Sequence, residues 1–287
     1  MKVRIALGLG GSPIDAEDLR SIVSTMTALR FDSLWVSDVL TAPGLDPIVT
    51  LSTAAALSPT LKLGTTLLAP GRHELRFAKT LASLDVVSGG RLLLTFVPGL
   101  AYGPERDAIG VTVADRGAAI ERTMSKLRRW WAGETVDGVV VQPRPVQDPL
   151  EIWLAGLAPA SLERCGRIGD GWLGAACTPR EAQAAREAID AAADAADRAV
   201  DPEHFGISLA YRHEPLDDAH RAALSSRTKG RDVDPAALVP IGYDALRRQL
   251  QAYIDVGMSK FVVRPAVRQS WTEELAELAL AIGDLQN

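Results

Sequence analysis

The sequence predicts an α/β fold, a single (β/α)8 barrel of the TIM-barrel type with loop excursions. Strand-length apolar runs recur eight times, and each is followed by a helical pattern at the spacing of a βα unit. The runs hold little charge in their interiors, as expected for parallel strands buried on both faces. With 287 residues, of which 47% are hydrophobic, the chain can fill such a barrel as one domain over residues 1–287.

The first half of the chain contains four βα units. Their strands are expected at 2–9, 33–37, 61–68 and 91–97, and their helices at 15–29, 46–57, 75–87 and 115–132. Asp15 is placed to cap the first helix, and the third helix ends at Gly89-Gly90, where a left-handed residue is typical of a helix end. A longer irregular stretch separates the fourth strand from its helix.

The alternation resumes after an excursion, "ETVDGVVVQPRPVQDP", which is typical of a small hairpin rather than of a domain linker. The remaining strands are expected at 151–155, 171–176, 205–213 and 259–265. The remaining helices are expected to open near Pro159 and to cover 179–199, 243–257 and 271–285, with a polar helical segment after 213. Residues 216–240 carry mixed charges and are expected to form a mobile insertion.

An open, doubly wound sheet is the alternative fold. "GLGG" at 8–11 follows the first strand and precedes a helix, as a dinucleotide-binding fingerprint would. The spacing of Gly8 and Gly10 requires a third glycine at position 13, which is Pro13. The barrel is therefore the preferred prediction.

Charge and hydropathy exclude several classes of function. The formal net charge is −5, and Lys and Arg are scattered, which argues against a nucleic-acid surface and a polybasic membrane anchor. No apolar run approaches the ~20 residues of a membrane span, and the N-terminal "MKVRIALGL" alternates like a strand and lacks a cleavage site. We therefore expect a cytoplasmic protein with a small-molecule substrate and no nucleic-acid or membrane partner.

The cysteines and histidines predict no metal site. Cys165 and Cys177 are unrelated by any metal-binding spacing and are expected to be reduced thiols. The four histidines are dispersed along the chain, so no metal-ligating constellation forms.

A barrel of this kind builds its site at the C-terminal ends of the strands. The residues expected there are mostly small or polar: Leu9 and Gly10, Ser37 and Asp38, Thr66 to Gly71, Pro98 and Gly99, Gly156, Cys177 and Thr178, Tyr211 and Arg212, and Arg264.

Six stretches of the chain carry a resemblance to a known family. They are "FDSLWVSDVL", "LKLGTTLL", "RFAKTLASLDVVSGGRL", "DRGAAIERTMSKLRRWW", "PRPVQDPLEIWLAGLAPASLERCGRIGDGWL" and "IGYDALRRQLQAYIDVGMSKFVVRP". As a set they resemble the bacterial luciferase-like monooxygenase superfamily, and within it the coenzyme F420-dependent (deazaflavin) oxidoreductase branch. The resemblance covers roughly 1–175 and 240–265, and the segment 205–238 resembles nothing recognisable.

The resemblance implies a homodimer and hydride transfer to or from coenzyme F420, with FMN as the alternative cofactor. It places the cofactor phosphate at Gly156 and Leu157, before a helix whose N–H groups and dipole favour an anion. Ala155 replaces the first of two glycines that the family often has there. Thr178 is a second candidate for contact with the cofactor, although it equally suits the N-cap of a helix that begins at Pro179.

Further cofactor positions lie on the third and fourth strands. Thr66 and Leu67 fall where the family often has a non-prolyl cis peptide bond behind the cofactor ring, a bond that sequence alone does not establish. By the same resemblance, Pro98 and Gly99 are expected beside the cofactor and Leu100 beside the substrate. Because Pro98 and Leu100 stand where the sugar-phosphate dehydrogenases have polar residues, the sequence argues against a sugar phosphate and for an apolar wall.

The second strand carries the candidate for acid–base chemistry. Family members commonly continue Ser-Asp with a histidine near the reactive edge of the ring, and here Val39 fills that place as a candidate substrate contact. Asp38 remains as a catalytic and cofactor-binding candidate, or as a structural partner of a nearby loop N–H. His73 is the candidate replacement for the missing imidazole, or a surface histidine that begins a helix.

The most concrete reading is an oxidoreductase that moves a hydride between F420 or FMN and a small, fairly apolar substrate. Arg72, Arg212 and Arg264 are candidate anion partners at the mouth, and Arg264 is the best-placed substrate contact. The alternatives are an FMN-dependent monooxygenase, a barrel that binds the ring without turnover, and an unrelated phosphate-binding isomerase or aldolase. The sequence places no catalytic lysine at a strand end, so it gives no support to the isomerase or aldolase alternative.

Overall fold

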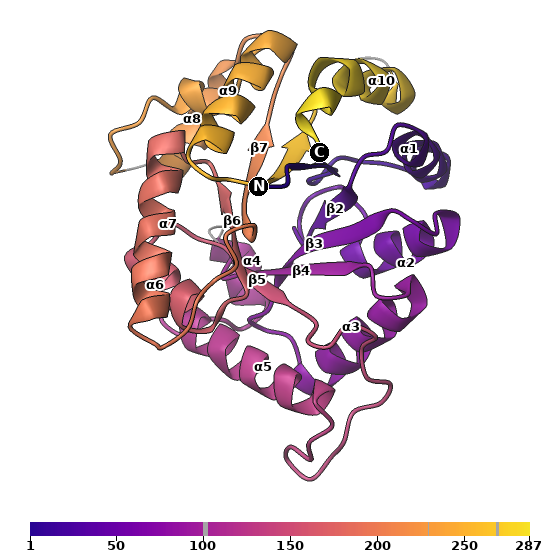
Figure 1. Cartoon of the computed structure of the whole chain (residues 1–287), viewed down its shortest axis with the longest axis vertical. Coiled ribbons are helices and arrows are strands. Elements are labelled where there is room, and N and C mark those ends of the chain that lie inside the picture. Colours follow the sequence, from indigo (N-terminus) through magenta and orange to yellow (C-terminus); the bar gives the residue numbers. More distant parts are fainter. Residues whose placement is uncertain (100–102, 229, 268–269) are drawn as a thin grey trace.

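Eight parallel strands close into a barrel in chain order, with β8 returning to pair with β1 (Figure 1). The computed structural model describes residues 1–99, 103–228, 230–267 and 270–287. The strands are β1 (Arg4–Gly8), β2 (Ser33–Ser37), β3 (Lys62–Leu68), β4 (Leu92–Val97), β5 (Ile152–Leu154), β6 (Gly171–Ala175), β7 (Phe205–Ala210) and β8 (Lys260–Arg264). The predicted (β/α)8 barrel is confirmed.

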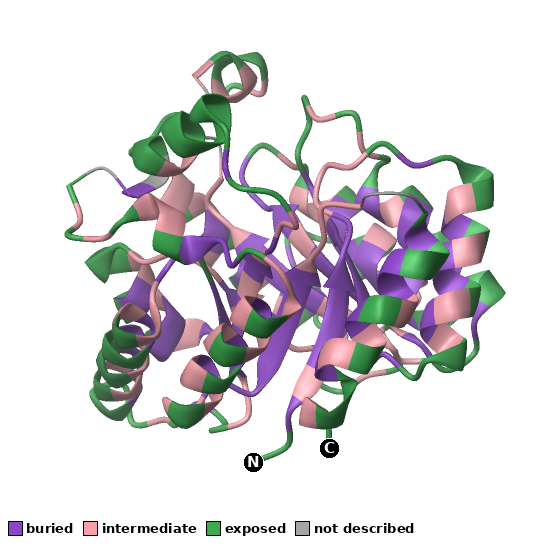
Figure 2. Cartoon of the chain, turned by 90° about the horizontal axis from the view of Figure 1, so that it is seen from above, coloured by how far each residue is buried: buried purple, intermediate pink, exposed green. Residues whose placement is uncertain are grey.

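The helices follow the strands and form an outer layer. They are α1 (Ala16–Ala28), α2 (Pro47–Leu57), α3 (Glu74–Ser88), α4 (Gly103–Ala108), α5 (Arg116–Trp131), α6 (Pro159–Ile168), α7 (Pro179–Asp194), α8 (Asp218–Thr228), α9 (Tyr243–Asp255) and α10 (Trp271–Ile282), with 3-10 turns η1 (Pro235–Leu238) and η2 (Gly283–Leu285). In Figure 2 the buried strands lie at the centre, and the helices are exposed on their outer sides.

Helix ends agree with the predicted signals except at α7 and α10. Asp15 accepts the N–H groups of Glu17 and Asp18, and Gly89 ends α3 with φ 68°. The predicted helix 179–199 stops at Asp194, because the chain turns through Asp197 at φ 52°. The predicted helix 271–285 ends at Ile282 and continues as η2.

Tryptophans and glycines fill the barrel interior together. Trp35 and Trp153 pack inside the barrel with Ala6, Leu173 and Val262. In the strand register Trp35 pairs with Gly64, and Trp153 pairs with Gly171. A Cβ added at Gly64 would lie 2.1 Å from the Trp35 ring, and one at Gly171 would lie 2.5 Å from Trp153. The glycines are therefore required because each indole occupies the space of its neighbour's side chain.

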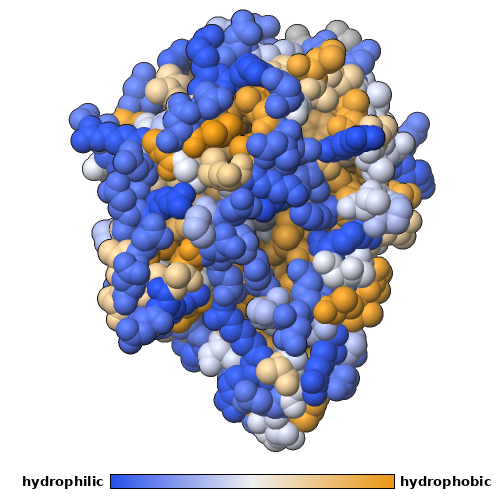
Figure 3. Space-filling model, viewed as in Figure 1, coloured by the Kyte–Doolittle hydropathy of each residue, from blue (hydrophilic) through white to orange (hydrophobic). Residues whose placement is uncertain are grey.

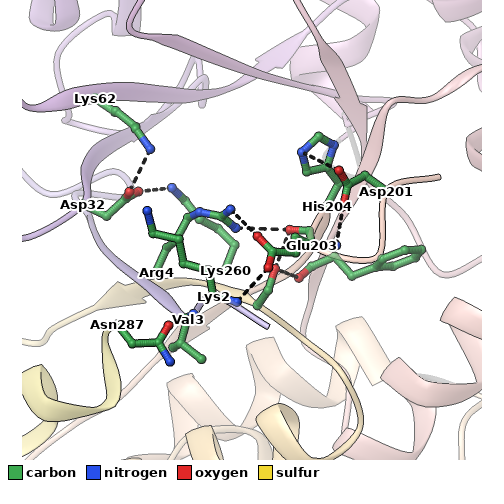
Figure 4. A network of polar contacts seen from close by, with 12 residues as sticks. Lys2, Val3, Arg4, Asp32, Lys62, Asp201, Glu203, His204, Lys260 and Asn287 are labelled. Carbon is green, nitrogen blue, oxygen red and sulfur yellow. Dashed lines mark hydrogen bonds and ion pairs between the residues drawn. The ribbon is translucent and has the colours of Figure 1, made fainter.

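Ion pairs close the end of the barrel at which the strands begin. Lys260 and Lys62 both bind the Asp32 carboxylate, and Arg4 binds Glu203 over 2.7 Å (Figure 4). Figure 3 shows this end of the molecule, where hydrophilic side chains surround a central hollow. Both termini lie at the same end (Figure 2), and in TIM barrels this end serves stability rather than catalysis.

Candidate active site

Three hydroxyl groups line the inner face of the barrel near its C-terminal end. Ser37 pairs with Thr66, Thr66 with Thr95, and Thr95 with Trp153, which packs inside the barrel, so these side chains share the inner face. Thr66 Oγ1 donates to Ser37 Oγ over 3.0 Å. Thr95 is fully buried, and its Oγ1 has no hydrogen-bond partner among the described residues. A buried hydroxyl without a partner favours a ligand with a polar edge here.

The Asp38 side chain bonds to groups at the end of β3 and does not point freely into the mouth of the barrel. Its Oδ2 accepts the Leu68 N–H over 3.1 Å and an Arg72 Nη2 hydrogen over 2.6 Å. Arg72 Nε in turn donates to the Leu68 carbonyl over 2.9 Å, and its guanidinium lies over the Phe77 ring. The Asp38 side chain is only 3% exposed. Both main-chain groups of Leu68 are thus fixed by one ion pair.

This geometry agrees with the structural alternative for Asp38, and its catalytic role stays a prediction. His73 is exposed at the N-cap of α3 and makes no capping hydrogen bond, so it has the geometry of a surface histidine that begins a helix. Val39 is 45% exposed on the β2–α2 loop. None of these positions supplies an imidazole at the inner face.

The third and fourth strands place only some of the predicted cofactor residues in the mouth. The side chain of Leu67 is fully buried in the core between barrel and helices, so only its backbone can face a ligand. The peptide bond between Thr66 and Leu67 is trans; the cis bonds of the described residues precede Pro143 and Pro149. Gly99 adopts φ 49°, and an added Cβ would lie 1.9 Å from Leu68. Pro98 is partly buried beside it, and Leu100 lies outside the described residues.

The N-terminus of α6 is open at the mouth. Its N-cap is Ala158, which has no side-chain acceptor for the first N–H groups. Gly156 adopts φ 122°, and a Cβ there would lie 2.9 Å from Ser161, while its carbonyl accepts the Trp172 Nε1 hydrogen. Leu157 is partly buried against the core. Pro159 has no N–H and the Ser161 N–H bonds the Ala158 carbonyl, so the first turn offers an anion the Ala160 N–H and the helix dipole.

Thr178 is the N-cap of α7, as the structural alternative predicts. Its Oγ1 accepts the Glu181 N–H, and Glu181 accepts the Thr178 N–H in return. Arg231 binds the same Glu181 carboxylate over 2.7 Å. Burial opposes ionisation of Glu181, but these bonds outweigh it and lower the pKa of the carboxyl. The Thr178 hydroxyl is thus already engaged within the protein. Its contact with the cofactor stays a prediction.

A cavity of about 330 Å³ opens at the C-terminal ends of β1, β6, β7 and β8. Arg264 lies on the β8 side, and its stem packs against the Gly8 backbone, where a Cβ would meet Arg264 Cγ at 2.7 Å. Arg212 and His220 reach the cavity from β7 and α8, and their side chains are joined by a 3.0 Å hydrogen bond. The cavity therefore brings the predicted Arg264 together with residues of 205–238, the segment that resembles no known family.

Cys177 also lines this cavity. Burial raises the pKa of its thiol to about 12, so the thiol is neutral at pH 7 and is a poor nucleophile. Among the described residues, no group of His, Cys, Asp and Glu is placed to hold a metal ion. Within that same part of the chain, no helix is both long and apolar enough to cross a membrane.

Sequence reasoning missed three features of the site. Thr95 was not among the predicted residues, because it lies inside the apolar run 91–97. His220 was left without a role, because nothing in the sequence places α8 over the cavity. Arg72 was considered as an anion partner, but its bond to Asp38 joins residues 34 positions apart, and no local pattern reports such a pairing. The sequence offered one weak signal for this ion pair: an acid follows the second strand and an arginine follows the third.

Comparisons with known proteins agree with this geometry. The family model for luciferase-like monooxygenases matches residues 2–281. The 5,10-methylenetetrahydromethanopterin reductase of Methanolobus tindarius is 27% identical over 235 residues, which cover 74% of this chain and 70% of that protein. The F420-dependent glucose-6-phosphate dehydrogenase of Beutenbergia cavernae is 28% identical over 225 residues, covering 70% of this chain and 65% of that protein.

The fold is shared with the coenzyme F420-dependent tetrahydromethanopterin reductase of Methanopyrus kandleri, at a TM-score of 0.82 and 15% identity over the full length of both chains. Because the family model spans nearly the whole chain and the barrel matches, the chain belongs to the luciferase-like monooxygenase family and is an enzyme.

Proposed function

We propose that this protein is an oxidoreductase that transfers a hydride between coenzyme F420 and a small organic substrate. The observation that carries the proposal is the open N-terminus of α6 behind Gly156, in a chain whose family match covers residues 2–281. Relatives named for F420 support this cofactor. FMN is the alternative, because the fold is shared with an FMN complex of a Pseudomonas putida Baeyer–Villiger monooxygenase component, at a TM-score of 0.72 and 14% identity.

The residues of the mouth fit a phosphate-bearing ring cofactor. The Gly156 turn, the Ala160 N–H and the dipole of α6 would hold the phosphate, and a side chain at position 156 would crowd this turn against Ser161. The hydroxyls of Thr66 and Thr95 would face the polar edge of the ring. When bound, the deazaflavin supplies the hydride-exchanging carbon. The chain's own task is to orient the ring and the substrate and to exclude water.

Asp38 and Arg72 act as positioning residues in this proposal. They fix Leu68 and therefore the end of β3, from which Thr66 faces the mouth. A site must hold its groups within a fraction of an ångström to be effective. The ion pair thus supports the ring-facing strand without touching the reacting atoms.

The test is a fluorescence titration of the purified protein with F420 and, separately, with FMN. We expect Gly156→Ala to raise the dissociation constant for F420 about tenfold, which corresponds to ~1.4 kcal/mol. Gly138→Ala is the matched control, because Gly138 also has a positive φ (77°) but has no atom within 4 Å of an added Cβ. Equal binding by both variants would contradict the phosphate site. Binding of FMN alone would favour the monooxygenase alternative.

The proposed turnover is tested by the absorbance of bound F420 in the presence of alcohols and carbonyl compounds. Oxidation or reduction of the deazaflavin by any of them supports an oxidoreductase. Tight binding with an unchanged redox state throughout would favour a barrel that binds the ring without turnover.

We also propose a homodimer in the cytoplasm. The exposed side of α2 supports the dimer, because this helix has no charged residue and exposes Val49 and Leu57. Val86 and Val87 are exposed on the neighbouring α3. Uncharged helix faces of this kind are typical of subunit contacts. Light scattering on the purified protein measures the oligomeric state, and a monomeric mass would exclude the dimer.

A further inference from the structure

The 330 Å³ cavity beside the proposed cofactor site has an unusual charge balance. Its basic side chains are Arg212, His220 and Arg264, and no carboxylate side chain is among the described residues that line it. This arrangement occurs in a chain with 36 acidic and 31 basic residues. A pocket lined by one sign of charge concentrates ligands of the opposite sign.

The donors of Arg212 are incompletely used. Its Nη1 bonds His220 Nε2 over 3.0 Å, and its buried Nε has no hydrogen-bond partner among the described residues. His220 Nδ1 is held by Asp217 over 2.6 Å, and this carboxylate lies outside the cavity lining with 59% of its side chain exposed. Solvent screens the charge of Asp217, so it neutralises the guanidinium only weakly.

Most of the other side chains that line the cavity are aliphatic, and the polar or aromatic ones are Ser12, Cys177, Ser208, Tyr211 and Tyr253. Leu216, Leu224, Leu238 and Val239 come from α8, η1 and their connections, and Leu209 comes from β7. The Tyr211 and Tyr253 hydroxyls already bond protein oxygens, so most hydroxyl groups of a polyol such as a sugar would lie against aliphatic side chains without partners. An aliphatic chain would bury its surface there.

We infer that this cavity binds the substrate, and that the substrate is an organic acid with one carboxylate and an aliphatic body. Arg212 and Arg264 would hold the carboxylate, since a guanidinium matches its two oxygens. The aliphatic body would lie against the walls from 216–239. The cavity volume suits a small ligand of this class, because ligand sites measure ~300–1,000 Å³. The inference rests on the proposed function and deepens it by naming the substrate class.

The test is isothermal titration calorimetry of the full-length protein with octanoate, octan-1-ol and octyl phosphate. We expect octanoate to bind about tenfold or more tightly than octan-1-ol, because only the carboxylate makes charged hydrogen bonds with the guanidinium groups. We expect Arg212→Met and Arg264→Met each to weaken octanoate binding about tenfold, since methionine keeps much of the stem and removes the charge. Arg122→Met is the control, because Arg122 is exposed on α5 and does not line the cavity.

The circular dichroism spectrum and melting temperature report whether each variant folds. Arg212→Lys and Arg264→Lys keep the charge but lose the planar fork, and we expect intermediate octanoate affinity. They keep the inference testable if either methionine variant fails to fold. Equal affinity of the lysine variants and the wild type would overturn the assignment of the carboxylate to the guanidinium groups.

F420 titration of the same variants separates this inference from the proposed function. If octanoate binds but F420 does not, the proposed function fails and the acid site stands. If F420 binds and octanoate does not, the inference is overturned and the proposed function stands. Loss of F420 affinity in the arginine variants, with octanoate affinity unchanged, would assign the cavity to the cofactor. Binding of octyl phosphate alone would overturn the carboxylate assignment.

Discussion

At the scale of single residues, the acid at the end of β2 illustrates how burial changes the role of a side chain. Asp38 stands at a strand end, where barrel enzymes place catalytic groups. Its carboxylate is nevertheless occupied by the Leu68 N–H and by Arg72. A carboxylate held in this way is more useful as a support than as a proton acceptor.

We predict that Asp38→Asn lowers the free energy of unfolding by about 1.5–3 kcal/mol, because a charge-assisted hydrogen bond in a buried site is lost. Urea unfolding measures the change. Asp107→Asn is the control and should have little effect, since Asp107 is 76% exposed and pairs with Arg106 at 3.8 Å. Wild-type stability of Asp38→Asn, together with an altered pH profile of turnover, would instead restore the catalytic role.

Sequence reasoning placed Asp38, Gly156 and Arg264 at the correct end of the barrel, because strand ends follow from the apolar runs. It did not determine what each side chain contacts. The partner of Asp38 comes from beyond the next strand, and the environment of His73 depends on the direction of a loop. Such long-range contacts leave no local pattern in one sequence.

At the scale of elements, the strands were the easiest features to predict. Each is a short apolar run bounded by turn residues, and the closed barrel follows from eight such runs with helical crossovers. Prediction was poorer for α8, whose composition is polar and whose helical pattern has little apolar periodicity. Its position over the cavity is a tertiary feature, so the cavity that we propose for the substrate could not be predicted.

We predict that Gly64→Ala lowers the free energy of unfolding by at least about 1–3 kcal/mol, because the new Cβ would lie 2.1 Å from the Trp35 ring. The measurement is the urea midpoint of the variant. Gly283→Ala is the control, since an added Cβ there has nothing within 4 Å. In a Trp35→Leu background, Gly64→Ala should lower the free energy of unfolding by less than it does in the wild type. Equal effects in the two backgrounds would refute the steric explanation.

At the scale of the whole molecule, the two ends of the barrel have different tasks. The C-terminal end holds an open helix N-terminus, a cavity with basic side chains and the Thr95 hydroxyl, which has no partner in the described part of the chain. The opposite end holds paired charges around Asp32 (Figure 4). Unsatisfied groups at one end and satisfied groups at the other agree with function at the first and stability at the second.

The ion pairs at the N-terminal end make stability depend on pH. Burial alone would raise the pKa of Asp32, but Lys260 and Lys62 outweigh it and lower the pKa to about 2, from an ordinary value of 3.8. Because the folded value is the lower one, Asp32 contributes its full stability above about pH 4 and loses it as the pH falls toward 2. Burial lowers the pKa of Lys260 to about 8 even beside Asp32, so the cost of burying this ammonium group offsets part of the stability that the Asp32 shift contributes.

We therefore predict that Asp32→Asn lowers the free energy of unfolding at pH 7 by about 2 kcal/mol or more, since Lys260 is left buried without its carboxylate. Urea unfolding at pH 7, 4 and 3 should show that the difference in free energy of unfolding between variant and wild type becomes smaller as the pH falls. A gap that stays constant would mean that Asp32 is not the group that titrates. F420 affinity of the folded variant should equal that of the wild type, because the pair lies at the end of the barrel away from the proposed site, and a weakened affinity would show that the two ends are coupled.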